Sequence, residues 1–355
     1  MLIIVFYLKY RPKTVSEIDN TKVREIISKI LNSGNLSHAY LFVGQKGTGK
    51  TSAARIFSKA INCLDNKFTN RKNRSFEPCN RCHNCLSISH STSVDILEMD
   101  AASNRGIDDV RKLIHESNFL PMTSRYRVFI IDEAHMITPE AFNALLKTLE
   151  EPPQSVIFIF ATTNKEKLPK TIISRCQVVN FGRANQKDII RMLNRCIEGE
   201  KIKIEEKLFP LIASHSDFSF RDAAKILEEL VIQGKLTFTD GQKFLGFYRR
   251  DFLEILEKKD LKTTLSWIDE FSQTGGSIKV LIEQIIEELR AILFKKSGLI
   301  IDEATDTKLT KKEIITLIKI LTQAYQNLRT SPIESLPLEI AIVEFYNETY
   351  SKVKS

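Results

Sequence analysis

Short apolar segments alternate with amphipathic ones along the first half of the chain, as far as about Phe181. The apolar segments have the length of buried strands, and they occupy residues 39–43, 94–99, 126–131 and 156–161. The amphipathic segments have helical spacing and predict helices near residues 23–31, 49–62, 107–118 and 139–149. Strands and helices that alternate in this way form a parallel sheet covered on both faces, so the pattern predicts an α/β domain.

Beyond about Phe181 the strand pattern fades, and only helical periodicity remains. The predicted helices of this part occupy residues 185–198, 219–233, 249–259, 277–295, 310–329 and 337–350. Gly275-Gly276 predicts a turn between two of them. The chain is therefore expected to be an α/β domain followed by all-helical domains.

Composition places the chain among ordinary soluble globular proteins, because 43% of its 355 residues are hydrophobic and 27% are charged. The net charge of +8 is compatible with an anionic partner such as nucleic acid, although many basic proteins have none. The opening MLIIVFYL lacks the basic leader and cleavage site of a secretory signal, so a short strand or a docked arm is expected. No apolar run is long enough to span a membrane, and the six cysteines are expected to be reduced in the cytoplasm.

A phosphate-binding loop is predicted between the first strand and the helix that follows it. The sequence there, GQKGTGKT, fits the pattern G-x-x-x-x-G-K-[ST], and a chance glycine-rich turn is the alternative. Glycines let backbone N–H groups face the phosphates of ATP, Lys50 can reach the β- and γ-phosphates, and the Thr51 hydroxyl can bind Mg²⁺. The expected nucleotide-binding residues are Gly44, Gln45, Lys46, Gly47, Thr48, Gly49, Lys50, Thr51 and Ser52.

Two acidic residues follow the predicted strand at 126–131, in the sequence VFIIDEAH. Asp132 is expected to hold Mg²⁺, and Glu133 is the candidate base that activates the attacking water. A solvated acidic turn is the alternative. One helix later, Thr163 and Asn164 follow another strand and can contact the γ-phosphate or position the water, although polar residues also end strands for turn reasons. These elements together predict ATP hydrolysis.

Arg175 follows Asn164 by about a dozen residues, in the sequence IISRCQ. An arginine at this place can form a structural ion pair. It can also act as an arginine finger, which stabilises the charge that builds on a transferred phosphoryl group. The spacing does not tell which subunit's site such a finger would serve.

Three cysteines, at positions 79, 82 and 85, have the two-residue spacing of a metal site. Cys63 is the best candidate for a fourth ligand, with His83 and His90 as alternatives. Four thiolates suit a closed, structural Zn²⁺ site, and free reduced cysteines are the other possibility. The polar insert at 64–78 is expected to be a loop that the metal holds in place. Cys176 and Cys196 are not expected to be ligands.

Several motifs in combination resemble the bacterial DNA polymerase III gamma/tau family, the AAA+ motor subunits of sliding-clamp loaders. They are the phosphate loop, DEAH (132–135), NALLKTLEEPP (143–153), ATTN (161–164), SRC (174–176), KYRP (9–12), HAYLFVG (38–44) and DAAS (100–103). The resemblance implies a motor that hydrolyses ATP to load the sliding clamp onto primed DNA. It also implies an AAA+ domain at 1–181 with a zinc module at about 63–90, a helical lid at 182–240 and a helical collar at 241–355.

The same resemblance implies roles for single residues. Arg175 would be the finger that reaches the neighbouring subunit's ATP site, and Arg221 would touch phosphate from the lid. Ser219 and Asp222 suit a capping box at the start of the Arg221 helix. Tyr10 and Arg11 would line the nucleotide, and the long tail of the tau form is expected to be absent. The implied partners are the delta and delta-prime subunits, further copies of the chain, the sliding clamp and the phosphate backbone of primed DNA, with Arg105 as a candidate contact.

Two departures from the family pattern stand out. Ile18-Asp19-Asn20 occupies the place of a common VGQ, which affects the expected adenine contacts. Phe218 replaces the usual glycine before Ser219, which could shift the start of the Arg221 helix.

Two other functions remain as alternatives. A DEAH-type helicase would need a second motor domain with its own strands, and the helical second half does not predict one. A delta-prime-like subunit often has a degraded phosphate loop, whereas this chain keeps Lys50, Thr51, Asp132 and Glu133.

Overall fold

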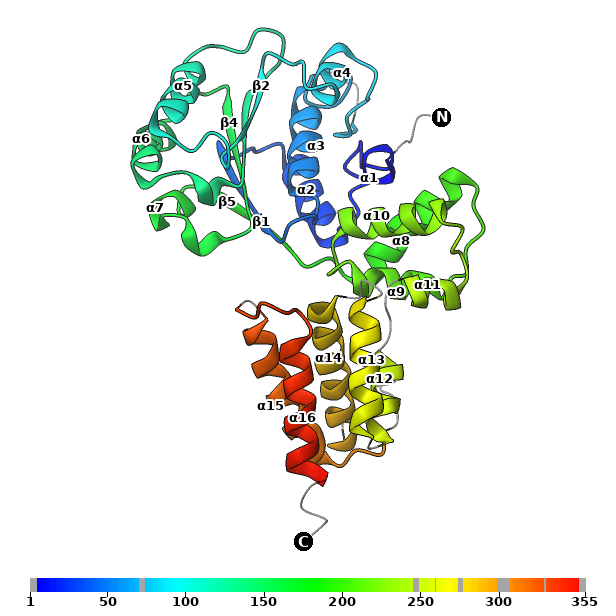
Figure 1. Cartoon of the computed structure of the whole chain (residues 1–355). Coiled ribbons are helices and arrows are strands. Elements are labelled where there is room, and N and C mark those ends of the chain that lie inside the picture. Colours follow the sequence, from blue (N-terminus) through cyan, green and yellow to red (C-terminus); the bar gives the residue numbers. More distant parts are fainter. Residues whose placement is uncertain are drawn as a thin grey trace. The chain divides into compact units, whose positions relative to one another are not determined.

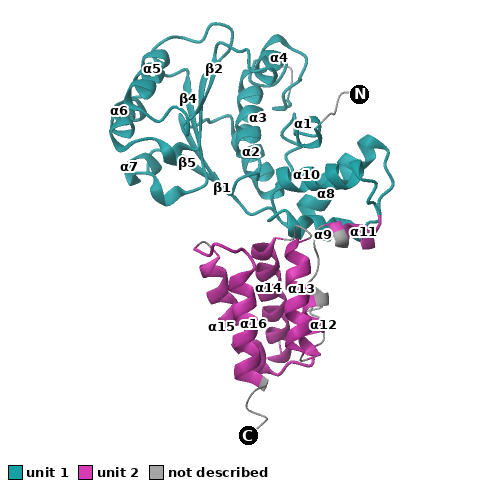
Figure 2. Ribbon diagram, viewed as in Figure 1, with its two compact units in different colours: residues 1–236 teal, residues 237–355 magenta. Residues whose placement is uncertain are grey.

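The computed structural model describes residues 5–69, 74–244, 249–258, 260–273, 277–298, 307–328 and 330–350. The chain forms two compact units, Met1–Leu236 and Thr237–Ser355, and each is described by itself (Figure 2). The finer division into 1–181, 182–240 and 241–355 stays a prediction. The turn predicted at Gly275-Gly276 lies outside the described residues.

Unit 1 is built on a five-stranded sheet in the order β2-β3-β4-β1-β5, with every neighbouring pair parallel. Its strands are β1 (Ala39–Gly44), β2 (Ile96–Asp100), β3 (Arg127–Asp132), β4 (Val156–Thr162) and β5 (Gln177–Gly182). Four of them confirm the predicted parallel sheet. The fifth, β5, was not predicted, because only Val179 and Phe181 of this edge strand are buried.

Helices cover both faces of the sheet, as predicted (Figure 1). One layer contains α2 (Thr21–Ser33) and α3 (Lys50–Asn62), and the other contains α5 (Ile107–Ser117), α6 (Pro139–Glu150) and α7 (Lys170–Ile173). Successive side chains of β1 point to opposite faces, so Tyr40 and Phe42 pack in the first layer and Leu41 packs in the second. Since every residue of β4 is buried, the sheet is covered on both sides.

Helix ends follow local sequence signals. Helix α6 begins after Thr138, whose hydroxyl accepts a hydrogen bond from Ala141 N, and Pro139 occupies its first turn. Helix α2 ends at Gly34, which has a left-handed backbone with φ of 70°. Both the start of α6 and the end of α2 were predicted from the sequence.

A helical layer follows the sheet in unit 1 and contains α8 (Gln186–Glu200), α9 (Leu208–His215) and α10 (Phe220–Ile232). The short helix α9 was not predicted. The N-terminal residues 1–4 lie outside the described part, and α1 (Phe6–Lys9) is a helix rather than the strand considered above. It is docked on this helical layer, because Phe6 N donates to Glu228 Oε2 at 2.9 Å and the Tyr10 hydroxyl donates to Glu200 Oε1 at 2.7 Å.

The secondary structure of unit 2, in its described residues, consists of helices alone. It contains α11 (Phe238–Phe244), α12 (Arg249–Glu257), α13 (Leu261–Gln273), α14 (Ile278–Lys296), α15 (Lys311–Asn327) and α16 (Leu336–Tyr350). Helices α11 and α13 were not predicted. Beyond Gly182 the described residues contain no strand, so they provide no second α/β motor domain of the kind a helicase needs. Among the described helices, none is both long enough and apolar enough to cross a membrane.

Candidate functional site

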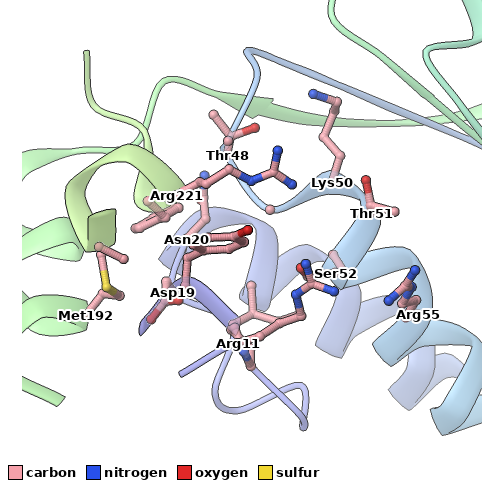
Figure 3. Close-up of a pocket in the computed structure, with 18 of the residues that line it drawn as sticks. Arg11, Asp19, Asn20, Thr48, Lys50, Thr51, Ser52, Arg55, Met192 and Arg221 are labelled. Atoms are coloured by element: carbon pink, nitrogen blue, oxygen red, sulfur yellow. The ribbon is translucent and has the colours of Figure 1, made fainter. Parts of the chain in front are cut away.

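A cavity of about 270 Å³ lies in unit 1 where β1 and β3 end. Its lining includes the phosphate loop, both ends of the N-terminal arm (residues 10–20) and the start of α10, together with residues of α1, α8 and the end of β3. Figure 3 shows Lys50 and Thr51 toward one end of the cavity and Asp19 and Met192 toward the other. Of the residues predicted to bind nucleotide, those in the lining are Tyr10, Arg11, Lys46, Gly47, Thr48, Gly49, Lys50, Thr51, Ser52, Asp132 and Arg221, together with the candidate base Glu133.

The phosphate loop turns through two left-handed glycines, Gly47 with φ of 78° and Gly49 with φ of 92°. The buried ammonium of Lys50 donates to the carbonyl oxygens of Gly44 at 2.8 Å and Gln45 at 2.9 Å. Gly44 and Gln45 therefore position the lysine through their carbonyl oxygens, and they do not themselves line the cavity. Burial lowers the pKa of Lys50. The loop thus holds a desolvated ammonium at the end of β1.

The two residues predicted to bind Mg²⁺ contact each other. The Thr51 hydroxyl at the start of α3 donates to Asp132 Oδ2 at the end of β3 at 2.6 Å. These residues are far apart in the sequence, and the parallel strands bring them to the same edge of the sheet. A hydroxyl beside a carboxylate is a donor set that suits a hard divalent cation.

Glu133 has a left-handed backbone with φ of 47° and ψ of 43°, which is strained for a residue other than glycine. Its Oε2 accepts a hydrogen bond from the Thr163 hydroxyl at 3.3 Å and lies 3.4 Å from His135 Nδ1. His135 Nδ1 also lies 3.1 Å from Thr162 Oγ1. The sequence interpretation assigned no role to His135, although its place in DEAH was the available signal. This carboxylate is therefore oriented by Thr163, directly after β4, and by His135, in the turn after β3.

Asn164 takes part in a turn. Its Oδ1 accepts from Glu166 N at 3.1 Å and caps the short helix η2 (Lys165–Lys167). Neither Asn164 nor Thr163 lines the cavity. Thr163 thus contacts Glu133 and Asn164 takes part in a turn, while the predicted contact of either residue with the γ-phosphate or the attacking water stays a prediction.

Arg175 lies away from the cavity of its own chain. Its side chain is 31% exposed, and its guanidinium pairs with Glu150 at the end of α6 and donates to Thr171 O at 2.8 Å. This is the structural ion pair considered above. It does not test the second role, in which the arginine would serve a neighbouring subunit.

The start of α10 lies against the phosphate loop. Phe220 N donates to Gly47 O at 3.1 Å, and Ser219 accepts from Asp222 N at 3.3 Å, which forms one half of the expected capping box. Phe218 has a left-handed φ of 56°, the conformation that glycine adopts without strain. The helix begins directly after Ser219, and Arg221 lies in the lining.

The N-terminal arm contributes a buried acid to the cavity. Asp19 is 7% exposed, and one of its carboxylate oxygens lies 3.0 Å from Arg195 Nη1 of α8. Burial raises the pKa of Asp19 to about 6, although Arg195 acts in the opposite direction. Tyr10 and Arg11 also line the cavity, and burial lowers the pKa of Arg11. Asp19 belongs to the segment that departs from the family pattern.

Four cysteines form a second candidate centre. The Sγ atoms of Cys63, Cys79, Cys82 and Cys85 all lie within 4.8 Å of one another, a grouping that can hold one metal ion. The group does not include His83 or His90. Backbone N–H groups at 79, 82 and 85 donate to the sulfur atoms of Cys63, Cys79 and Cys82 respectively, at 3.3 to 3.5 Å.

The thiols of these four residues differ in environment. Burial raises the pKa of Cys63 and of Cys85. Burial acts in the same direction on Cys79, but backbone N–H groups outweigh it and lower the pKa of Cys79 to about 7. Helix α4 (His83–Ser89) begins within this cluster and was not predicted. Cys176 and Cys196 lie outside it, and burial raises the pKa of each to about 12.

Comparisons with known proteins give consistent results. Residues 19–185 match the family described as DNA polymerase III, delta subunit. The tau subunit of DNA polymerase III from Bacillus subtilis is 34% identical over 95% of this chain and 62% of its own length. Among solved structures, the RuvB Holliday junction branch migration motor of Thermotoga maritima is 18% identical, with a TM-score of 0.49 over 70% of this chain and 79% of that one. That likeness is too weak to carry an argument.

The share of a relative's own length that this chain covers differs between the relatives. The chain spans about 60% of the length of the first curated relatives that it matches. It covers 77% of the gamma subunit of DNA polymerase III from Buchnera aphidicola, which is 36% identical over 80% of this chain. At this identity and coverage, the chain belongs to the DNA polymerase III gamma/tau family.

Proposed function

We propose that this chain is an ATP-driven motor subunit of a bacterial DNA polymerase III clamp loader, which hydrolyses ATP to load the sliding clamp onto primed DNA. The observation that carries the proposal is the meeting of Lys50, Thr51, Asp132 and Glu133 at one cavity, with Arg221 beside them. These five residues come from three separate segments of the chain. The relatives named gamma and tau support the same function.

The cavity residues divide the expected chemistry among them. Backbone N–H groups of the phosphate loop and the ammonium of Lys50 would bind the phosphates of ATP. Thr51 and Asp132 would hold Mg²⁺, which would neutralise charge on the β- and γ-phosphates. Glu133 would orient and deprotonate the attacking water, and its hydrogen bond from Thr163 would fix the direction of the carboxylate. The intact set supports a motor rather than a delta-prime-like subunit.

Assembly would complete the site. Arg175 lies outside the cavity of its own chain and is partly exposed, as expected of a group that acts on a neighbour. The neighbours would be further copies of this chain and the delta and delta-prime subunits. In that arrangement the finger would stabilise the negative charge of the transition state in the adjacent ATP site.

The cysteine cluster would hold Zn²⁺. Four thiolates provide a closed tetrahedral donor set with no position left for a substrate, and the grouping within 4.8 Å suits it. The ion would cross-link the segment around 64–78 to the end of α3, where Cys63 lies. Its role would be structural.

Contacts with primed DNA would be made mainly to phosphates, so they would depend on salt and not on sequence. The net charge of +8 supports this expectation. Arg105 is exposed and remains a candidate contact. The reducing cytoplasm is the compartment that fits free cysteines and a thiolate metal site.

Steady-state ATP hydrolysis by the chain, assembled with its own delta and delta-prime subunits, tests the proposal. We expect strong joint stimulation by the sliding clamp and primed DNA, and loss of that stimulation in Lys50→Ala. The control is the same assembly with clamp alone or DNA alone, which should stimulate less. Hydrolysis that ignored the clamp and followed strand separation on duplex DNA would instead support the helicase alternative.

A further inference from the structure

The N-terminal arm lines the nucleotide cavity at both of its ends and not in its middle. Residues 10–12 and 18–20 belong to the lining, whereas residues 13–17 do not. The position of the two ends therefore depends on what fixes the segment between them. Lys13 N donates to Glu17 Oε2 at 2.7 Å, so this middle segment is closed into a compact turn.

The middle of the arm is held by a carboxylate from the cysteine module (residues 63–90). Glu77 Oε2 accepts from Val15 N at 2.7 Å, and Glu77 Oε1 accepts from Ser16 N at 2.9 Å. Both oxygens of one carboxylate thus bind two successive backbone N–H groups, a geometry that fixes direction as well as distance. Glu77 lies two residues before Cys79.

A second contact joins the same parts. The buried ammonium of Lys59 in α3 donates to Lys13 O at 2.8 Å and to Asn80 Oδ1 at 2.8 Å. Asn80 lies between Cys79 and Cys82 and has a left-handed φ of 53°. Lys59 of α3 therefore contacts both the N-terminal arm and the turn between Cys79 and Cys82.

Glu77 is itself held by the fold of the module. The side chain of Asn66 donates to Phe76 O at 3.1 Å and to Ala60 O at 2.6 Å, which ties the segment before Glu77 to the end of α3. Immediately after it, Cys79 N donates to Cys63 Sγ at 3.3 Å. Phe76, directly before Glu77, also packs against the core of unit 1. The order of the segment therefore depends on that packing, on these hydrogen bonds and on the sulfur cluster.

We propose that Glu77 is a positioning residue through which the cysteine module holds the arm against the nucleotide. The module then has a defined task in the motor: metal binding orders the segment that carries Glu77, and Glu77 orders the arm. Loss of the metal would loosen the arm and weaken nucleotide binding without touching the phosphate loop. The inference rests on the proposed ATP site and adds a connection between the two centres.

The test compares Glu77→Ala and Glu77→Gln with the wild-type chain. Zinc content, the Kd for ATP and hydrogen exchange at the amides of Val15 and Ser16 are measured on each. We expect full zinc content, faster exchange at both amides, and about tenfold weaker ATP binding in Glu77→Ala. Glu77→Gln keeps one acceptor oxygen, so its Kd for ATP and its amide exchange rates should lie between those of the wild type and Glu77→Ala.

A matched control is Asp65→Asn, which removes a carboxylate of the same module that pairs with Arg81. It should leave the Kd for ATP and the two amides unchanged. In the assembled complex, Glu77→Ala should raise KM for ATP and leave kcat close to wild type, because the carboxylate contacts neither Lys50 nor Glu133. Chelation of the metal should weaken ATP binding in the wild type and add little in Glu77→Ala, since both act through the same contact.

The outcomes separate this inference from the proposed function. If the wild type binds ATP and Lys50→Ala does not, the ATP site stands. Wild-type affinity and wild-type amide exchange in Glu77→Ala would then overturn the inference alone. If the wild type fails to bind ATP, the proposed function fails, while the amide exchange still reports whether Glu77 holds the arm.

Discussion

The carbonyl oxygen of Gly47 accepts a hydrogen bond from the backbone N–H of Phe220 at 3.1 Å. The phosphate loop is thereby joined to the first turn of α10, which carries Arg221 into the cavity. A substitution in the phosphate loop should therefore alter the position of Arg221, and a substitution at the start of α10 should alter the conformation of the loop.

Substitution of Gly47 by alanine tests that connection. The added Cβ would lie 1.9 Å from Ser219 Oγ, and the residue would be kept at a φ of 78°. The backbone strain and the lost cap of α10 together should cost about 2–3 kcal/mol of unfolding free energy and weaken ATP binding. Chemical denaturation and ATP titration measure the two effects.

Gly34→Ala is the matched control, because Gly34 also has a left-handed φ, of 70°, and no atom lies within 4 Å of an added Cβ. It should show the backbone strain alone, about 1–2 kcal/mol, and leave the Kd for ATP unchanged. Equal effects of the two substitutions on ATP binding would contradict a specific contact between the phosphate loop and α10.

Glu133→Gln should separate binding from hydrolysis. The amide cannot accept the proton of the attacking water, so kcat should fall by about 10²-fold to 10⁴-fold while the Kd for ATP stays near that of the wild type. Lys50→Ala should lose binding itself, because the ammonium is the buried cation of the loop. A Glu133→Gln protein that still hydrolysed ATP at the wild-type rate would remove Glu133 from the role of base.

Asp19 predicts a pH dependence of stability. Burial raises its pKa from 3.8 to about 6 in the folded chain, so the folded state binds the proton more tightly than the unfolded state. The stability that this provides is complete below about pH 4 and is lost as the pH rises through about 6, with a total of about 3 kcal/mol. Because other acids titrate nearby, the measured quantity is the difference in unfolding free energy between wild type and Asp19→Asn. It should change by that amount between pH 4 and pH 7, and a constant difference would refute the prediction.

Arg175→Ala tests the finger in an assembled complex. If the arginine serves a neighbouring site, ATP hydrolysis should fall by about 10³-fold while ATP binding by the isolated chain is preserved. Mixing Arg175→Ala with Lys50→Ala chains should recover part of the hydrolysis, because an intact phosphate loop then lies beside an intact finger. No recovery would indicate a role within one chain, and Arg183→Ala, another exposed arginine, is the control.

The parts of the structure that the sequence predicts are those with a local signal. The strands β1 and β4 are continuous apolar runs, and the phosphate loop is a contiguous motif, so both follow from residues close together in the chain. The edge strand β5 buries only two of its side chains and resembles a loop in the sequence. Its partner β1 makes it a strand, which is a tertiary effect.

The contacts between distant segments have no such signal. The contact of Glu77 with Val15 joins residues 62 positions apart, and neither belongs to a recognisable motif. Asp19 could be seen as a departure from a family pattern, but its burial against Arg195 of α8 depends on how the helical layer packs. The four cysteines lie between these cases, because their spacing predicts a cluster and only the fold selects Cys63 over the histidines.

The most direct test of the central claim counts clamps on DNA. Labelled sliding clamp, circular primed DNA, ATP and the assembled complex are passed over a gel-filtration column that separates DNA-bound clamp from free clamp. We predict that the wild-type chain places clamps on the circles and that they slide off once the circles are linearised, whereas Lys50→Ala loads none. Equal loading by the wild type and Lys50→Ala, or no loading by either in a complex that binds clamp and ATP, would contradict the assignment of this chain as the motor.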